Sequence, residues 1–170
     1  LPRFGMRVLV NKQYNQAQWL GRGPFDNYSD RNYAADVDVY SMPADSLFHP
    51  YARAQESGYR TDIRWVGLVD QRGSGIMAVA DSLLSTGILN FDYNRLNFDR
   101  HAPENNHGGS MNNDDFIWWN IDYAQSGVGG DNAWGATPHS EYQLPYKNYS
   151  YSFTLKPVLE GDEFIEISKR

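Results

Sequence analysis

Apolar and polar residues alternate along much of this chain, as they do in β-strands that bury one face. The stretch 35–40, ADVDVY, sets acids between apolar residues. Two apolar runs, 63–70 and 76–81, are separated by five residues that include two glycines, which predicts a hairpin. The strongly apolar run 116–123, FIWWNIDY, is predicted to lie centrally in a sheet. Further strands are predicted at 4–10, 16–20 and 150–155.

Two segments depart from this alternation. Residues 82–93 have helical character, although Gly87 interrupts it, and 164–167 is expected to be a last edge strand or part of a tail. The predicted strands have no paired helices, which excludes a doubly wound α/β fold. The sequence therefore predicts an all-β fold, an antiparallel β-sandwich.

Composition adds an aromatic signal to this picture. With 170 residues, of which 41% are apolar, the chain can bury the core of one domain. Aromatic residues reach 15%, with five Trp, twelve Tyr and eight Phe. Aromatic faces stack on the C–H faces of sugar rings, while Asn, Asp and Arg bond sugar hydroxyls. The same residues would also fill the space between packed sheets, so composition leaves both interpretations open.

Charge and cysteine content exclude several classes of protein. The formal net charge of −6 argues against a nucleic-acid or anionic-membrane partner. The absence of cysteine excludes thiolate metal sites, disulfides and cysteine nucleophiles. No apolar run approaches the roughly 20 residues of a membrane helix. Because the chain starts with Leu-Pro-Arg-Phe rather than Met, we expect a processed chain or a piece of a longer protein, and its compartment stays undetermined.

Candidate catalytic and metal-binding residues are few. Histidines and carboxylates gather in the polar stretch 97–115, namely at His101, Glu104, His107, Asp114 and Asp115. Imidazole and carboxylate suit several divalent ions, but this spacing matches no ligand motif, and we interpret the stretch as a solvated loop. A glycosidase needs two carboxyl groups that face each other across the scissile bond. None of the six glutamates suggests such a pair.

Two motifs carry more information. The first is 19–31, WLGRGPFDNYSDR, in which Gly21, Gly23 and Pro24 predict a tight corner after a strand. The second is 118–134, WWNIDYAQSGVGGDNAW, where a strand ends in glycines that present a tryptophan at a loop tip.

Together these motifs resemble the C-terminal domain, or small chain, of the beta-galactosidases of glycoside hydrolase family 2. The family pattern is Trp-x-Gly-x-Gly-Pro-x-Glu-Asn-Tyr-x-Asp-Arg, from which this chain departs by having Asp26 for the Glu. The middle segment 49–64, HPYARAQESGYRTDIR, is also similar, with Ser57 in place of an Asn. The resemblance covers 3–155, whereas the stretch 97–115 and the tail match poorly.

The resemblance implies a galactose-mutarotase-like supersandwich, of which this chain would hold about the C-terminal half. A β-sandwich domain would then span 1–157, and 158–170 would form the edge strand or tail. It also implies a retaining enzyme that hydrolyses terminal non-reducing β-D-galactose residues, with catalytic glutamates and magnesium and sodium sites in other domains. We therefore expect no cofactor or metal in this chain, no catalytic residue, and no activity of the chain alone.

The resemblance assigns one substrate-binding residue, Trp134, which would reach the active site of the catalytic part and stack against the sugar. Gly129, Gly130 and Asp131 would support and aim it. The arginines of the matched segments are interpreted as ion-pair partners of nearby aspartates rather than as ligand contacts. These charged residues are Arg22, Arg31, Arg60 and Arg64, with Asp26, Asp30 and Asp62.

Several alternatives stay open. The chain could be a stand-alone carbohydrate-binding module, or a separately encoded small subunit. An epimerase on the same fold would need a His and Glu pair in the sheet, yet all four histidines fall in predicted loops. The expected partners are a galactoside and a catalytic TIM-barrel domain of the same or a partner chain, with no nucleic acid or membrane. We also expect an open sheet edge, which would allow a homo-oligomer.

Overall fold

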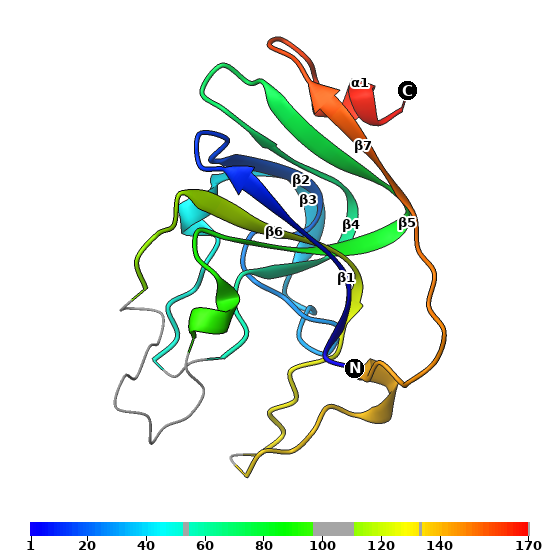
Figure 1. Cartoon of the computed structure of the whole chain (residues 1–170). Helices are drawn as coiled ribbons and strands as arrows, with labels where there is room; N and C mark the ends of the chain where they lie inside the picture. The colour runs from blue at the N-terminus through cyan, green and yellow to red at the C-terminus, as the bar shows by residue number, and fades with distance from the viewer. Residues whose placement is uncertain (53–54, 97–110, 133, 170) are drawn as a thin grey trace.

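The computed structural model describes residues 1–52, 55–96, 111–132 and 134–169. Its main element is a seven-stranded antiparallel sheet with the order β1-β6-β5-β4-β2-β3, in which β7 pairs with β5 (Figure 1). The strands are β1 Arg3–Asn11, β2 Gln16–Gly23, β3 Asp36–Pro43, β4 Tyr59–Val69, β5 Gly75–Leu89, β6 Phe116–Gln125 and β7 Phe153–Val158. Short 3₁₀ turns lie at Ala44–Ser46, Tyr93–Arg95 and Ser140–Tyr142, and helix α1 is Phe164–Ser168. The all-β, antiparallel prediction is confirmed.

The long strand β5 gives the sheet its shape. Gly75 to Ala80 pair with β7, whereas Ser85 to Leu89 pair with β6. Strand β4 runs along the other side of β5 with register shifts near Ile63. The change of neighbour lets the sheet curl, so that one core takes buried side chains from five strands. Its members include Val10, Trp19, Ile63, Leu68, Leu84, Ile88, Ile117 and Trp119.

The helical reading of 82–93 is wrong, because β5 continues to Leu89. Residues 84–89 are all buried between β4 and β6, so the alternation that marks a half-exposed strand is lost. Gly87 fits this position: a Cβ there would lie 3.3 Å from Asn120 Nδ2 and 3.3 Å from the Tyr59 ring. Its presence reflects close packing between strands.

Of the two expectations for 164–167, an edge strand or part of a tail, the edge strand is wrong, since these residues form α1. Phe164 and Ile167, three positions apart, share one helix face and are both buried. The Phe164 ring stacks on Trp65 of β4 at a centroid distance of 5.2 Å. The end of the chain therefore packs against the sheet and covers a second core cluster.

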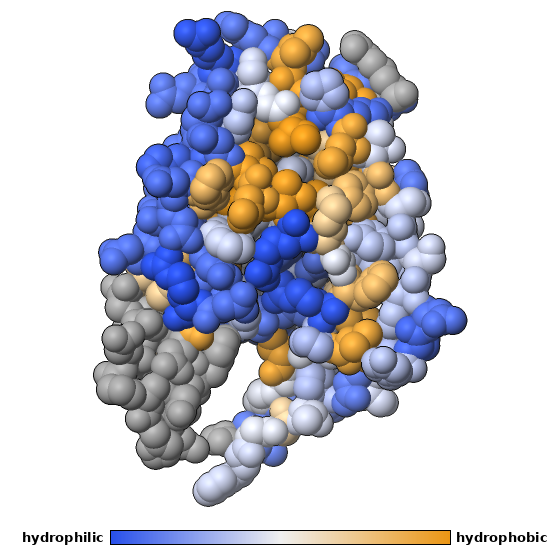
Figure 2. All heavy atoms as spheres, viewed as in Figure 1, coloured by the Kyte–Doolittle hydropathy of each residue, from blue (hydrophilic) through white to orange (hydrophobic). Residues whose placement is uncertain are grey.

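Open edges are present in the sheet. Among the described strands β3 pairs only with β2, and β1 only with β6. Val37 and Val39 on β3 are each 43% exposed. Figure 2 shows apolar side chains gathered in the middle of the viewed face. On the edge strand β1, Met6 and Leu9 are 38% and 50% exposed. The predicted open edge is thus observed, while pairing with a further partner stays a prediction. The described helices include none that is long and apolar enough to span a membrane.

A buried carboxylate joins three strands. Asp122 of β6 accepts a hydrogen bond of 3.0 Å from Tyr59 Oη of β4. Its Oδ2 lies 3.8 Å from Arg3 Nη1 of β1, and Arg3 also donates to Glu56. Gly5 permits this approach, because a Cβ there would lie 2.0 Å from Asp122 Oδ1. Burial raises the pKa of Asp122 to about 6, although Arg3 and the Tyr59 hydroxyl oppose the shift.

We predict that Asp122 makes stability depend on pH. A folded pKa of about 6 exceeds the unfolded value of about 3.9. The folded state therefore binds the proton more tightly, and this stabilisation is full below pH ~3.9 and is lost as the pH rises through ~6. Relative to that of Asp122→Asn, the free energy of unfolding of the wild type should fall by about 3 kcal/mol from well below pH ~3.9 to well above pH ~6, measured by urea unfolding at each pH.

The control is Asp81→Asn, which changes an exposed carboxylate and should leave the pH dependence of the wild type intact. An Asp122→Asn curve that follows the wild type at every pH would contradict the raised pKa of Asp122.

Candidate functional site

The first matched motif forms a corner that is fixed to β4 by Asn27. This side chain is fully buried, and its Oδ1 accepts hydrogen bonds from the N–H and the hydroxyl of Thr61, at 3.0 and 2.6 Å. The Asn27 N–H donates to the carbonyl of Tyr59 at 2.8 Å. Because every one of these bonds crosses to β4, the corner keeps a fixed position on the sheet.

Asp30 links this corner to the loop that follows β6. Its two carboxylate oxygens accept the backbone N–H groups of Val128 and Gly129, at 3.0 and 2.8 Å. Gly127 leaves room for the carboxylate, since a Cβ there would lie 2.4 Å from Asp30 Oδ2. Hydrogen bonds to a charged acceptor are stronger than neutral ones. The base of the loop is thus held by Asp30, which lies about a hundred positions earlier in the sequence.

The glycines of the loop adopt backbone conformations that suit them. Gly129 and Gly130 have φ of 67° and 106°, in the region that other residues rarely adopt. At Gly129 a Cβ would also lie 2.6 Å from the carbonyl oxygen of Ala136. Both glycines therefore shape the loop that follows β6 (Figure 1).

Trp134 lies beyond these glycines and is 94% exposed. The backbone N–H of Trp134 donates to Asn132 Oδ1 at 2.9 Å. This bond is of the Asx-turn type. Asp131, to which the resemblance assigns support of the loop, forms an ion pair with His139. The hydrogen bond and charge of Asp131 raise the pKa of His139. Asn132, two residues before Trp134, was the sequence signal for this hydrogen bond, and the sequence analysis did not use it.

A hollow of about 700 Å³ lies between the corner and Tyr142. Asp26 sits at its wall with a side chain only 8% exposed, and it accepts hydrogen bonds from Tyr51 Oη at 3.1 and 3.2 Å. Arg31 donates to Tyr51 Oη at 2.9 Å. Burial and the Asp26 charge raise the pKa of Tyr51, so its hydroxyl stays protonated. The wall can offer a guanidinium and a phenol to a polar ligand.

The expected ion pairs form in part. Arg22 Nε lies 2.6 Å from Asp62 Oδ2, and Arg31 Nη2 lies 3.4 Å from Asp26 Oδ2. Asp30 binds backbone amides rather than an arginine. Sequence reasoning could not find this role, because the amides are about a hundred positions away.

The other two arginines bind carbonyl groups. Arg60 donates to the carbonyls of Leu47 and Pro24, both at 2.9 Å, and lies over the Trp19 ring at 5.4 Å. Burial lowers the pKa of Arg60 to about 10. Arg64 donates to the carbonyl of Asp62 at 2.5 Å. Their part is structural, and among the residues that the structure describes they form none of the expected ion pairs.

The described part of the chain contains no group of three or more side chains suited to a metal ion. Asp114 accepts hydrogen bonds from Arg95, from the Trp118 indole and from a backbone amide, and Asp115 pairs with Lys12. His101, Glu104 and His107 lie outside the described residues. The two described carboxylates of this stretch are thus engaged in local structure.

Comparison with known proteins agrees with the motifs. The family model of the beta galactosidase small chain matches residues 1–155. The beta-galactosidase of Pseudoalteromonas haloplanktis is 35% identical over 156 residues, which are 91% of this chain and 14% of that protein. The beta-galactosidase of Priestia megaterium is 34% identical over 161 residues, 93% of this chain and 15% of that protein. This chain thus spans about a seventh of the length of these relatives, and it belongs to the beta galactosidase small chain family.

Proposed function

We propose that this chain is the part of a beta-galactosidase that places Trp134 against the sugar, at a catalytic site built by another part of the enzyme. The single observation that carries the proposal is the 94% exposed indole on a loop whose base is bound by Asp30. Tryptophan is enriched at binding interfaces, where its ring presents a large apolar face. Gly129, Gly130 and Asp131 support the loop.

The anchoring favours binding for a thermodynamic reason. A loop that must be ordered when ligand arrives loses conformational entropy, and this loss weakens the complex. Here two hydrogen bonds to Asp30 and one from Gly127 N–H to the Tyr142 carbonyl, at 2.7 Å, order the base beforehand. The indole then offers a flat apolar face, which suits the C–H face of a galactose ring.

The chemistry itself we assign to the rest of the enzyme. Under this proposal the complete protein, a family 2 glycoside hydrolase, cleaves terminal non-reducing β-D-galactose residues with retention, which needs two carboxyl groups about 5–5.5 Å apart. The two glutamates that supply these carboxyl groups, and the magnesium and sodium sites, would belong to other domains, including the catalytic barrel. The carboxylates around the corner, Asp26, Asp30 and Asp62, are each engaged by donors of this chain, which supports that division.

A stand-alone carbohydrate-binding module is the second candidate, and the exposed Trp134 also suits it. The match to about a seventh of several beta-galactosidases favours the first. A separately encoded small subunit would have the same role as a fused domain.

The substitution Trp134→Ala tests the proposal in the complete enzyme. Loss of stacking should raise KM for a galactoside by about one to two orders of magnitude, equivalent to about 1.4–2.8 kcal/mol. The melting temperature should stay unchanged, because the indole is outside the core. Steady-state kinetics and thermal unfolding measure the two effects.

Tyr146→Ala is the matched control, since this tyrosine is equally exposed at 94% and should leave KM unchanged. A normal KM for Trp134→Ala, together with a much lower melting temperature, would make Trp134 a packing residue.

Asp30→Asn tests whether the anchor acts through Trp134. The amide would turn a donor toward one of the two N–H groups, which removes one hydrogen bond worth about 1 kcal/mol. KM should rise about fivefold in the wild-type background. In a Trp134→Ala background the same change should have little effect, because the two residues act as one unit. Equal effects in both backgrounds would show that Asp30 stabilises the domain in general.

The chain alone should not hydrolyse nitrophenyl β-galactoside, because under this proposal the catalytic pair of carboxyl groups belongs to other domains. The assay uses purified chain from a host without its own beta-galactosidase. Robust turnover under these conditions would refute the division of roles between this chain and the rest of the enzyme.

A further inference from the structure

The loop that carries Trp134 has two arms, and each arm is bound near its base. The outgoing arm follows β6, and Asp30 accepts two of its backbone amides. The returning arm ends in the 3₁₀ turn Ser140–Tyr142. There the carbonyl of Tyr142 accepts the N–H of Gly127 at 2.7 Å. Both bases are therefore fixed to the body of the domain.

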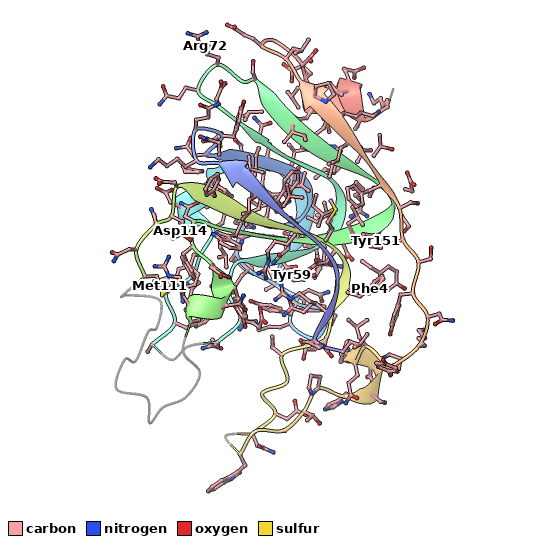
Figure 3. All side chains as sticks on the ribbon, in the orientation of Figure 1. Phe4, Tyr59, Arg72, Met111, Asp114 and Tyr151 are labelled. Atoms are coloured by element: carbon pink, nitrogen blue, oxygen red, sulfur yellow. The ribbon has the colours of Figure 1, made fainter. Side chains whose placement is uncertain are left out.

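The tip of the loop lies beyond these anchors, at the opposite end of the molecule from Arg72 (Figure 3). Trp134 is 94% exposed, so its indole gains little from packing against the described residues. The hydrogen bonds that the structure describes for residues 131–138 all stay within the loop. The position of the indole therefore depends on contacts inside the loop itself.

One of these contacts joins the two arms. Asp131 of the outgoing arm forms an ion pair and a hydrogen bond with Nε2 of His139, which lies eight positions later on the returning arm. Trp134 lies between them in sequence, next to Gly135, whose φ is 83°. Closing this short ring removes conformations that the tip could otherwise adopt. The pair thus restricts the backbone that carries the indole.

The charges around His139 favour its protonated form. The hydrogen bond and charge of Asp131 raise the pKa of His139 most, and the carboxylates of Glu141 and Asp30 add to the shift, although desolvation opposes it. The ion pair is therefore complete below the unperturbed pKa of about 6.5 and is lost as the pH rises through the raised pKa of His139. Order in the loop tip should follow the same pH dependence.

We propose that His139 is a positioning residue for the tryptophan that contacts the sugar, because its ion pair with Asp131 fixes the tip of the loop. His139 does not touch the sugar and acts through Trp134. The inference rests on the proposed function, in which Trp134 stacks on galactose. A loop that is ordered before the ligand arrives loses less conformational entropy on binding. An exposed ion pair contributes little to stability, so the effect belongs to affinity and not to folding.

The test measures the dissociation constant of a non-hydrolysable methyl thiogalactoside, by competitive inhibition of the complete enzyme at about pH 6 and about pH 9. At the lower pH, His139→Ala should weaken binding about two- to fourfold relative to the wild type. At the higher pH, the two proteins should bind almost equally, because His139 of the wild type is then neutral. The comparison at each pH cancels the pH dependence of the rest of the enzyme.

A permanent cation should rescue the interaction. The guanidinium of His139→Arg is charged at both pH values. This variant should bind like the wild type at the lower pH, and about two- to fourfold more tightly than His139→Ala at the higher pH.

Two further variants separate the ion pair from the general charge of the loop. Asp131→Asn should bind like His139→Ala at the lower pH. Glu141→Gln is the matched control, because it removes a neighbouring charge and leaves the hydrogen bond between Asp131 and His139. It should bind like the wild type at both pH values. All of these variants should keep the melting temperature of the wild type.

Two results would overturn the proposal. The first is equal affinity of His139→Ala and the wild type at the lower pH, or a difference that is the same at both pH values. The second is an undiminished effect of His139→Ala in a Trp134→Ala background, since residues that act as one unit should not be additive. Either result leaves the proposed function intact if Trp134→Ala itself weakens binding. If Trp134→Ala binds normally, the proposed function fails, and the role of His139 fails with it.

Discussion

Two hydrogen bonds to one carboxylate connect the two informative parts of this chain. Asp30 of the corner accepts the amides of Val128 and Gly129, 98 and 99 positions away. Asn27 fixes the corner to β4, so the loop after β6 takes its position from the sheet although it projects beyond it. Charge-assisted bonds of this kind resist loop motion better than neutral ones. The exposed indole of Trp134 can therefore be presented from an ordered base.

Close approach of polar groups to glycine recurs in the fold. Gly5 makes room for Asp122, and Gly127 makes room for Asp30. In both places a carboxylate from one segment reaches the backbone of another, which any Cβ would prevent. The missing Cβ thus permits both the contact between β1 and β6 and the anchoring of the loop by Asp30. At Gly5 and Gly127, glycine marks a contact between distant segments.

Buried polar groups differ in how completely they are bonded. Asp122 has Tyr59 as a donor and Arg3 nearby. Arg60 bridges two carbonyls through its Nη atoms, whereas its Nε and the Oε1 of Gln125 have no partner within the described chain. A bonded group of this kind rigidifies the fold, whereas a buried polar atom without a partner costs stability.

The sequence by itself determined the strands with one exposed face, the all-β class and the family, because alternation and the glycine-rich motifs are local patterns. The run 4–10, for example, lies within β1, Arg3–Asn11. Only the tertiary structure decided that β5 extends to Leu89 and that Phe164–Ser168 is a helix. It also decided that Asp30 binds the loop of Gly129 instead of an arginine. These features depend on neighbours far away in the sequence, whose burial and hydrogen bonds outweigh local propensity.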